Sequence, residues 1–400
     1  MKMFKLSAVT ALLVTSVTAG GLSLYEDPTT HQVFTEAGEG RVKLGNYVDE
    51  MTAKDSLNDA IKKEVKTKLS SKAKKLKFHG RHYLGYTYSD YDGDKQDSGR
   101  FETRRNYLQV KAYFDDKSYA RVTLDTHNIS DGKDENGNYI AGKDIEGTWN
   151  VRLKYAYAWL DNILPHTGVE IGQVHRPWID YEEHHGWWYR HISKVFVEDG
   201  NGAHLINSAD IGVNFKTKVD YFSSEIGLLN GEGYHSSDGS LEDFDSSLEW
   251  RFTLHPLGTG KKKINRKKDE HLDISFFGVM SKAHNKSSSA IATDFDMYGL
   301  HAVYNNPMFL VAGQYIKAED DKTKYDGDGF SLNTEIRPTN KWTILGRYDK
   351  WEAGKEGLHE DEQFMYGIGY QYNKYVEFIV NARDVKDDRT DYLFTTYVNW

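Results

Sequence analysis

Basic side chains recur at alternate positions in several segments of this 400-residue chain. In a β-strand, residues two apart share a face and lie roughly 7 Å from each other. Arg152 and Lys154 have this spacing, and like charges so close together are tolerated where water or anions screen them. The pattern predicts one basic wall that attracts anions, made of Arg105, Lys111, Arg121, Arg152 and Lys154. The alternative is that these charges only solvate a polar face and select nothing.

The longest connection in the chain, residues 176–205, combines charges with many aromatic side chains. Pro177 lacks a backbone donor and restrains Arg176, so the strand that begins at Val169 ends there. A loop of this length inside a compact domain is usually functional. We expect it to fold into the lumen of a barrel and narrow it, although a lid that covers nothing is the alternative. The candidate constriction residues are Arg176, Trp178, Asp180, Tyr181, Glu182, Glu183, Trp187, Trp188 and Arg190.

Metal binding and catalysis are not indicated by the motifs. The histidines of the long loop form no H-x-x-x-H or H-E-x-x-H pair, and packing among aromatics explains them: His175, His184, His185 and His191. One Asp/Gly-rich loop places Lys143 where a calcium loop needs a bidentate glutamate. There is no G-x-S-x-G motif, and His127 and Ser130 fall on opposite faces of a strand. We therefore predict no enzyme, no metal and no cofactor.

From Phe78 onward, segments of about 10 residues alternate apolar and polar side chains, as in a sheet with one face in lipid and one in water. Ala120, Val122 and Leu124 alternate with Arg121, Thr123 and Asp125. Residues 149–159 alternate in the same way, and we assign Trp149, Val151, Leu153, Tyr155, Tyr157 and Trp159 to the lipid face. About sixteen such segments predict an all-β transmembrane antiparallel barrel over residues 78–400.

The connections between these segments alternate between short and long. Short periplasmic turns and long outer loops give this rhythm in an antiparallel barrel. Residues 255–270 interrupt it, because this long stretch falls where a short turn belongs and carries Lys261-Lys-Lys263 and Arg266-Lys-Lys268. Either the stretch is a periplasmic excursion or a strand nearby has been miscounted. We interpret it as an excursion whose charges are solvated.

The two ends of the chain support export to the outer membrane. Residues 1–19 have a basic start, a short apolar core and small residues at the end, which predicts a signal peptide. Residues 20–77 are expected to form a periplasmic segment with a helix, because apolar residues recur every three or four positions from Thr52. A plug inside the pore is the alternative for this helix. The final strand ends on Trp400, with aromatic and apolar residues at alternate positions before it.

The overall composition limits which classes of protein remain compatible with the sequence. The chain has no cysteine and 14% aromatic residues, and its mean hydropathy is −0.69. Mean hydropathy underestimates the membrane-embedded surface of a barrel, because only alternate residues of each strand face lipid. A net charge of −9 argues against nucleic acid as a partner.

The barrel, Trp400 and the segment from Gly172 to Trp178 resemble the phosphate-selective porins O and P of Gram-negative outer membranes. In that family a strand ending in G-Q or G-K, a basic stretch and proline lead into the pore loop; here these are Gly172, Gln173, His175, Arg176 and Pro177. The resemblance implies a homotrimer in outer-membrane lipid that passes small polar solutes and ions. It also implies that Trp400 is an assembly signal for the barrel assembly machinery, and that Asp180, Glu182 and Glu183 face the basic wall.

Two functions are compatible with these features. The first is a water-filled channel for passive diffusion of ions and small polar solutes, with a preference for anions. The second is a barrel with an adhesion or envelope-anchoring role and a lumen blocked by loops. A conductance measurement separates the two.

Overall fold

The computed structural model describes residues 22–47, 59, 62, 75–93, 95–128, 149–231, 233, 246–284, 293–320, 325–354 and 360–400. The chain divides into two units, Met1–Lys74 and Lys75–Trp400. The predicted signal peptide, residues 1–19, lies outside the described residues. So does the predicted N-terminal helix, except for Asp59 and Lys62, which are both helical. In the described ranges, no helix is both long and apolar enough to cross a membrane.

The first unit contains a three-stranded antiparallel sheet that was not predicted from the sequence. Its strands are β1 (Leu22–Glu26), β2 (Val33–Phe34) and β3 (Val42–Tyr47), in the order β2-β1-β3. The Arg41 guanidinium lies 3.4 Å from the centroid of the Phe34 ring. These strands are too short for alternation to distinguish them from loop, and the predicted periplasmic segment with a helix did not include them.

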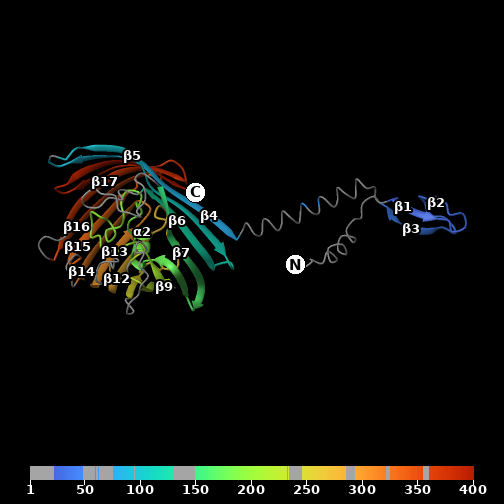
Figure 1. Ribbon diagram of the computed structural model, residues 1–400, viewed down its shortest axis with the longest axis horizontal. Helices are drawn as coiled ribbons and strands as arrows, with labels where there is room; N and C mark the ends of the chain where they lie inside the picture. Colours follow the sequence, from blue (N-terminus) through green and yellow to red (C-terminus); the bar gives the residue numbers. More distant parts are fainter. Residues whose placement is uncertain are drawn as a thin grey trace, which may run out of the picture. The chain divides into compact units, whose positions relative to one another are not determined.

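The second unit is a closed antiparallel barrel of sixteen strands, β4 to β19, as predicted (Figure 1). Each strand pairs with its neighbours in sequence, and β19 pairs with β4 to close the barrel. The strands are β4 (Leu76–Tyr91), β5 (Ser98–Tyr113), β6 (Tyr119–Asn128), β7 (Trp149–Leu164), β8 (Thr167–His175), β9 (Ala209–Lys218), β10 (Phe222–Leu229), β11 (Ser247–Leu254), β12 (His271–His284), β13 (Thr293–Asn305), β14 (Phe309–Asp320), β15 (Gly327–Ile336), β16 (Trp342–Ala353), β17 (Asp361–Gln371), β18 (Val376–Val385) and β19 (Arg389–Asn399).

Most connections have the predicted rhythm, but the one between β18 and β19, predicted to be long, is a short turn of residues 386–388. Short turns at residues 114–118, 165–166 and 219–221 alternate with longer connections at the other end of the barrel. Residues 255–270 join β11 to β12 at the short-turn end, so the predicted excursion is a real feature of the chain and not a miscounted strand.

The outward face of the barrel is apolar, as expected for a surface in lipid. Exposed outward side chains include Phe276, Leu300 and Ile344. Aromatic pairs lie near both rims: Trp342 packs on Tyr370 near the short turns, and Phe330 packs on Tyr348 toward the long loops. Two aromatic bands around an apolar belt are the signature of a transmembrane barrel.

Two β-bulges change which side chains enter the lumen. Tyr83 pairs with Arg105 and Leu84 with Thr103, so Arg104 is an extra residue in β5. Thr123 pairs with Tyr155 and Leu124 with Leu153, so Lys154 is an extra residue in β7. A bulge shifts the alternation by one residue beyond it. The assignment of Tyr155, Tyr157 and Trp159 to the lipid face was therefore wrong: Tyr155 and Tyr157 are buried on the inner side, and Trp159 packs against them.

The last residue of the chain packs at the seam that closes the barrel. The amide of Gly80 donates to the Trp400 carbonyl (2.9 Å), and the Trp400 amide donates to the Gly80 carbonyl (3.0 Å). The Trp400 indole covers Gly80 and donates from Nε1 to His82 Nε2 at 3.1 Å. A Cβ atom on Gly80 would lie 2.2 Å from the indole ring, so this position has no room for a side chain.

Filling this position should disturb barrel closure. We expect Gly80→Val to displace the Trp400 indole and to lower the yield of folded barrel, measured as the heat-sensitive band in detergent gels of unboiled protein. The matched control is Gly313→Val, since a Cβ at Gly313 meets its nearest atoms at 3.9 Å. Equal yields from the two variants would show that the indole contact does not matter for closure.

Candidate functional site

The connection from β8 to β9, residues 176–208, lies inside the barrel (Figure 1), and we call it the constriction loop. It begins with the short helix α2 (Pro177–His185), where the sequence had predicted irregular loop. Arg176 is extended and Pro177 takes the first helical position, where a missing backbone donor costs nothing. Tyr181 of α2 donates to Asp273 on β12 (2.7 Å), on the inner wall. These contacts hold the loop against the inner wall of the barrel.

Apolar packing fills one side of the lumen. The Trp178 ring stacks on Phe277 of β12 with ring centroids 3.7 Å apart and planes 1° apart. Around this pair, fully buried side chains of the constriction loop meet inward side chains of β12, β13, β14 and β16 in one cluster. Its members include Trp187, Ile192, Phe196, Val279, Met297, Ile316 and Leu345. Burial of each such side chain contributes about 1.5–3 kcal/mol, so the loop is firmly held against this side.

Ion pairs anchor the constriction loop where it crosses the lumen. Arg176, at the start of the loop, pairs with Asp210 (3.0 Å) and Glu249 (3.3 Å). On the far wall, Arg347 of β16 donates to the carbonyl of Lys194 (2.6 Å). Arg176 and Arg347 are each 1% exposed, so water screens these contacts little.

Two cavities remain between the constriction loop and the wall formed by β18, β19 and β4 to β8. The outer cavity, toward the long loops, measures about 1060 Å³, and the inner cavity, toward the short turns, about 290 Å³. Tyr83 and Arg190 line both. The larger space therefore lies toward the long loops and the smaller one beside α2.

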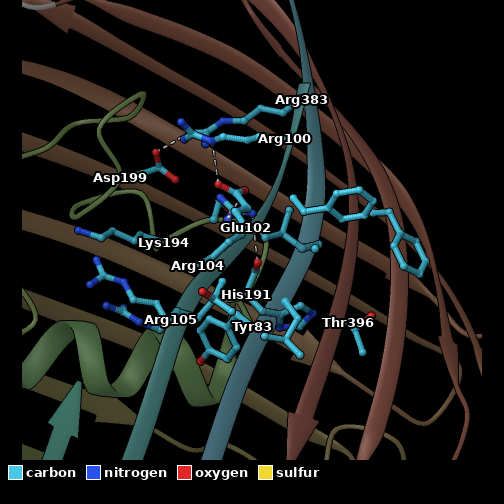
Figure 2. Close-up of a pocket in the computed structure, with 18 of the residues that line it drawn as sticks. Tyr83, Arg100, Glu102, Arg104, Arg105, His191, Lys194, Asp199, Arg383 and Thr396 are labelled. Carbon is cyan, nitrogen blue, oxygen red and sulfur yellow. Dashed lines mark hydrogen bonds and ion pairs between the residues drawn. The ribbon is translucent and has the colours of Figure 1, made fainter. Parts of the chain in front are cut away.

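The outer cavity is strongly basic. Figure 2 shows Arg383 beside Asp199 and Arg100 beside Glu102. The Arg383–Asp199 pair measures 2.5 Å and the Arg100–Glu102 pair 3.5 Å. Among the described lining residues, these two carboxylates face seven cations: Arg100, Arg104, Arg105, Arg152, Arg190, Lys194 and Arg383.

The inner cavity is also basic and contains the acidic side of α2. Its described cationic lining residues are Arg81, Lys111, Arg121, Lys154, Arg190 and Lys263. Asp180 and Glu183 face them from α2. Burial alone would raise the pKa of Asp180, but His175 and Lys216 hold it well below its usual range. Glu183 pairs with Arg190. Opposite charges thus face each other across the narrow part.

All five residues of the predicted basic wall line these cavities. Arg105 and Arg152 lie in the outer cavity, whereas Lys111, Arg121 and Lys154 lie in the inner one. Part of the charge is compensated, because Asp125 of β6 pairs with both Arg105 (2.9 Å) and Arg152 (2.8 Å).

The predicted loop residues divide between the two sides of the constriction loop. Asp180, Glu183 and Arg190 line the inner cavity. Trp178, Tyr181 and Trp187 are buried away from it, and Trp188 packs partly buried against the same cluster. Glu182 does not face the basic wall, contrary to the prediction: it is fully buried and accepts from Gln314 of β14. Helical geometry is the reason, since residues 180 and 183 share a face of α2 that residue 182 does not.

Several lining residues were not predicted from the sequence. Arg104 points inward because of the bulge, whose position no local pattern revealed. Arg383 could have been found, because it continues the inward alternation of Glu377, Ile379 and Asn381 on β18. Lys194 lies in irregular backbone of the constriction loop, where no periodicity assigns a direction.

His175 at the end of β8 and three histidines of the constriction loop pack against aromatic rings, as expected. His175 stacks on Tyr155 (3.9 Å between ring centroids) and His185 on Tyr181 (3.9 Å). His191 stacks on Tyr397 of β19 with centroids 4.9 Å apart and planes 8° apart. His184 packs edge-on to Trp188.

Comparisons with known proteins find the fold among porins. No family model and no curated protein matches the chain. An anion-selective porin from Comamonas acidovorans has a TM-score of 0.57 at 14% identity, over 81% of this chain and 99% of that one. OmpF of Salmonella typhi, solved with daunomycin, has a TM-score of 0.53 at 12% identity, over 81% and 97%. A mutant Rh. blastica porin has a TM-score of 0.51 at 12% sequence identity, over 81% of this chain and 100% of that one. The likeness establishes a porin-type barrel fold.

Docking of the constriction loop should weaken in acid through His191. Burial, with smaller effects from Arg266 and Arg104, lowers the pKa of His191 to about 3. An undocked His191 would protonate near its ordinary pKa of about 6.5. Neutral His191 therefore contributes its full stabilisation of loop docking above about pH 6.5. This contribution is lost as pH falls below about 6.5, by about 2 kcal/mol between pH 7 and pH 5.

The measurement is iodide quenching of tryptophan fluorescence at pH 7 and pH 5. Quenching should increase at pH 5 in the wild type and less so in His191→Phe, which keeps an aromatic ring between Tyr83 and Tyr397. His166→Phe, in an exposed turn, is the control and should behave as the wild type does. If His191→Phe shows the same pH dependence of quenching as the wild type, protonation of His191 is not the cause of the weaker docking.

Proposed function

We propose that this chain is an outer-membrane porin of a Gram-negative bacterium, a water-filled channel for ions and small polar solutes that prefers anions. The outward apolar belt with aromatic pairs near both rims supports a barrel in lipid. The observation that carries the channel role is the pair of cavities that share Tyr83 and Arg190, which together extend along the wall formed by β18, β19 and β4 to β8.

The charge of these cavities supports a preference for anions. In the outer cavity, seven cationic side chains face two carboxylates among the described lining residues. In the inner cavity, six cationic side chains face two carboxylates. A narrow passage lined by one sign of charge raises the local concentration of counter-ions and lowers that of like-charged ions. The carboxylates Asp180 and Glu183 stand opposite Lys111 and Arg121, so a transverse field would also orient dipolar solutes at the narrow part.

The finer identity of the solute is a further part of the proposal. The sequence resemblance to the phosphate-selective porins O and P makes phosphate one candidate anion, and the same resemblance suggests a homotrimer and delivery by the barrel assembly machinery. The proposal assigns no catalysis to the barrel.

A barrel with an adhesion or anchoring role and a blocked lumen is the second candidate. It is favoured by one observation, the buried cluster of the constriction loop against β12, β13, β14 and β16, which fills that side of the lumen. Planar-bilayer recording of purified wild-type protein decides between the two: unitary current steps support the channel, and a folded barrel that passes no current supports the blocked lumen.

Charge reversal in the path should change ion preference. We expect Arg100→Glu with Lys111→Glu, one residue from each cavity, to lower the anion-to-cation permeability ratio severalfold under a salt gradient. The effect should be larger at low salt, because screening weakens the field. The control is Lys117→Glu with Lys374→Glu, in exposed short turns that line neither cavity. If both double variants keep the wild-type reversal potential, these cations do not line the ion path.

Widening the narrow part should raise conductance. Tyr83 lines both cavities, whereas Tyr86 of the same strand packs on the outward Phe101. We expect Tyr83→Ala to increase single-channel conductance and Tyr86→Ala to leave it unchanged, provided that both barrels remain heat-sensitive in unboiled gels. A folded Tyr83→Ala channel with wild-type conductance would place the limiting section elsewhere.

A further inference from the structure

The excursion between β11 and β12, residues 255–270, has an ordered backbone fold. The amide of Asn265 donates to Asp269 Oδ2 (2.7 Å), and the amide of Asp269 donates back to the Asn265 carbonyl (2.9 Å). The amide of Gly260 donates to the carbonyl of Asp220 (2.8 Å), next to the neighbouring β9–β10 turn. The solvated charge run expected from the sequence would need none of these contacts.

The excursion reaches strands far from its own. Arg266 pairs with Glu377 of β18 (3.2 Å) and with Glu335 of β15 (3.5 Å). Asn305, at the end of β13, donates to the carbonyls of Arg266 (3.1 Å) and Asp269 (2.7 Å). The segment therefore extends across the short-turn mouth of the barrel and is anchored on strands β13, β15 and β18.

Arg266 also connects the excursion to the constriction loop. Its guanidinium carbon lies 4.6 Å from the ring centroid of Tyr189 and 5.9 Å from that of Trp188. Glu335 and Glu377 are only 2% and 3% exposed, and buried carboxylates are costly unless a cation pairs with them. Arg337 also pairs with Glu335 (3.0 Å). Arg266 is thus held between wall carboxylates and the rings of the constriction loop.

The other end of the excursion borders the proposed solute path. Lys263 lines the inner cavity together with Lys111 and Arg121. Its neighbour Lys262 is exposed and lines neither cavity. One segment therefore covers the mouth near β13, β15 and β18 and also contributes a cation beside the passage near β5 and β6.

We propose that residues 255–270 form a second constriction in series with the first, which closes the β13–β18 part of the inner mouth and leaves an exit beside Lys263. Arg266 is the positioning residue that holds the segment across the mouth, and Lys263 sets the charge of the exit. This inference rests on the proposed channel function. It goes beyond that function by placing a selectivity element on a short-turn connection.

The first test is single-channel recording of Arg266→Gln in planar bilayers, with Lys268→Gln as the matched control, since Lys268 is exposed in the same segment. Release of the segment from a barrel wide enough to hold an aqueous channel should raise conductance roughly twofold. Heat sensitivity of the unboiled protein establishes that each variant is folded. A folded Arg266→Gln channel with wild-type conductance would overturn the positioning role.

The second test does not depend on the buried pairs. Lys263→Glu should lower the anion-to-cation permeability ratio, and Lys262→Glu should leave it nearly unchanged. Equal reversal potentials in the two variants would overturn the role of Lys263 at the exit. Failure of the channel function itself is distinguishable, because the wild-type protein would then pass no current.

Discussion

The structure depends on an apolar inner wall that must be covered. On β12, β13, β14 and β16, the inward side chains Phe277, Met297, Ile316 and Leu345 are buried beneath the constriction loop. In a water-filled lumen these side chains would face solvent, at a cost of about 1.5–3 kcal/mol each. Trp178, stacked on Phe277, and Trp187 cover them. The loop is therefore part of the core of the barrel, and its position is set by apolar contact rather than by the charges that it carries.

The asymmetry of the lumen follows from that packing. Because the loop is held on one side, open space is left along β18, β19 and β4 to β8, where many inward side chains are basic. Arg105 and Arg152 share the buried carboxylate of Asp125, which lets two cations stand close together. Asp180 and Glu183 face the wall from α2 because the helix turns this side away from the core. The apolar packing that holds the loop on one side of the lumen therefore also leaves the charged passage on the other side.

The sequence predicted the barrel, its strand number and the inward loop, because alternation and loop length are local properties. It also predicted which side of β5 and β6 carries the basic wall. The prediction failed where one extra residue in a strand shifts the alternation of inward and outward side chains. The bulge at Lys154 turns Tyr155 and Tyr157 inward. The bulge at Arg104 places two adjacent arginines in the lumen. The prediction also failed for Glu182, whose direction depends on a short helix formed inside the barrel. The pairing of Arg266 with Glu335 and Glu377 joins distant strands, and local periodicity contains no information on it.

The central claim is that solutes pass along the wall formed by β18, β19 and β4 to β8 while the opposite side is closed. The absence of native cysteine allows a direct measurement by single-cysteine substitution and a charged, membrane-impermeant thiol reagent applied during bilayer recording. Gln109 lines the inner cavity, whereas Ser331 is 2% exposed on β15. The reagent should react rapidly with Gln109→Cys and reduce its current, and should leave Ser331→Cys unchanged. Rapid block of Ser331→Cys together with an inert Gln109→Cys would contradict the account.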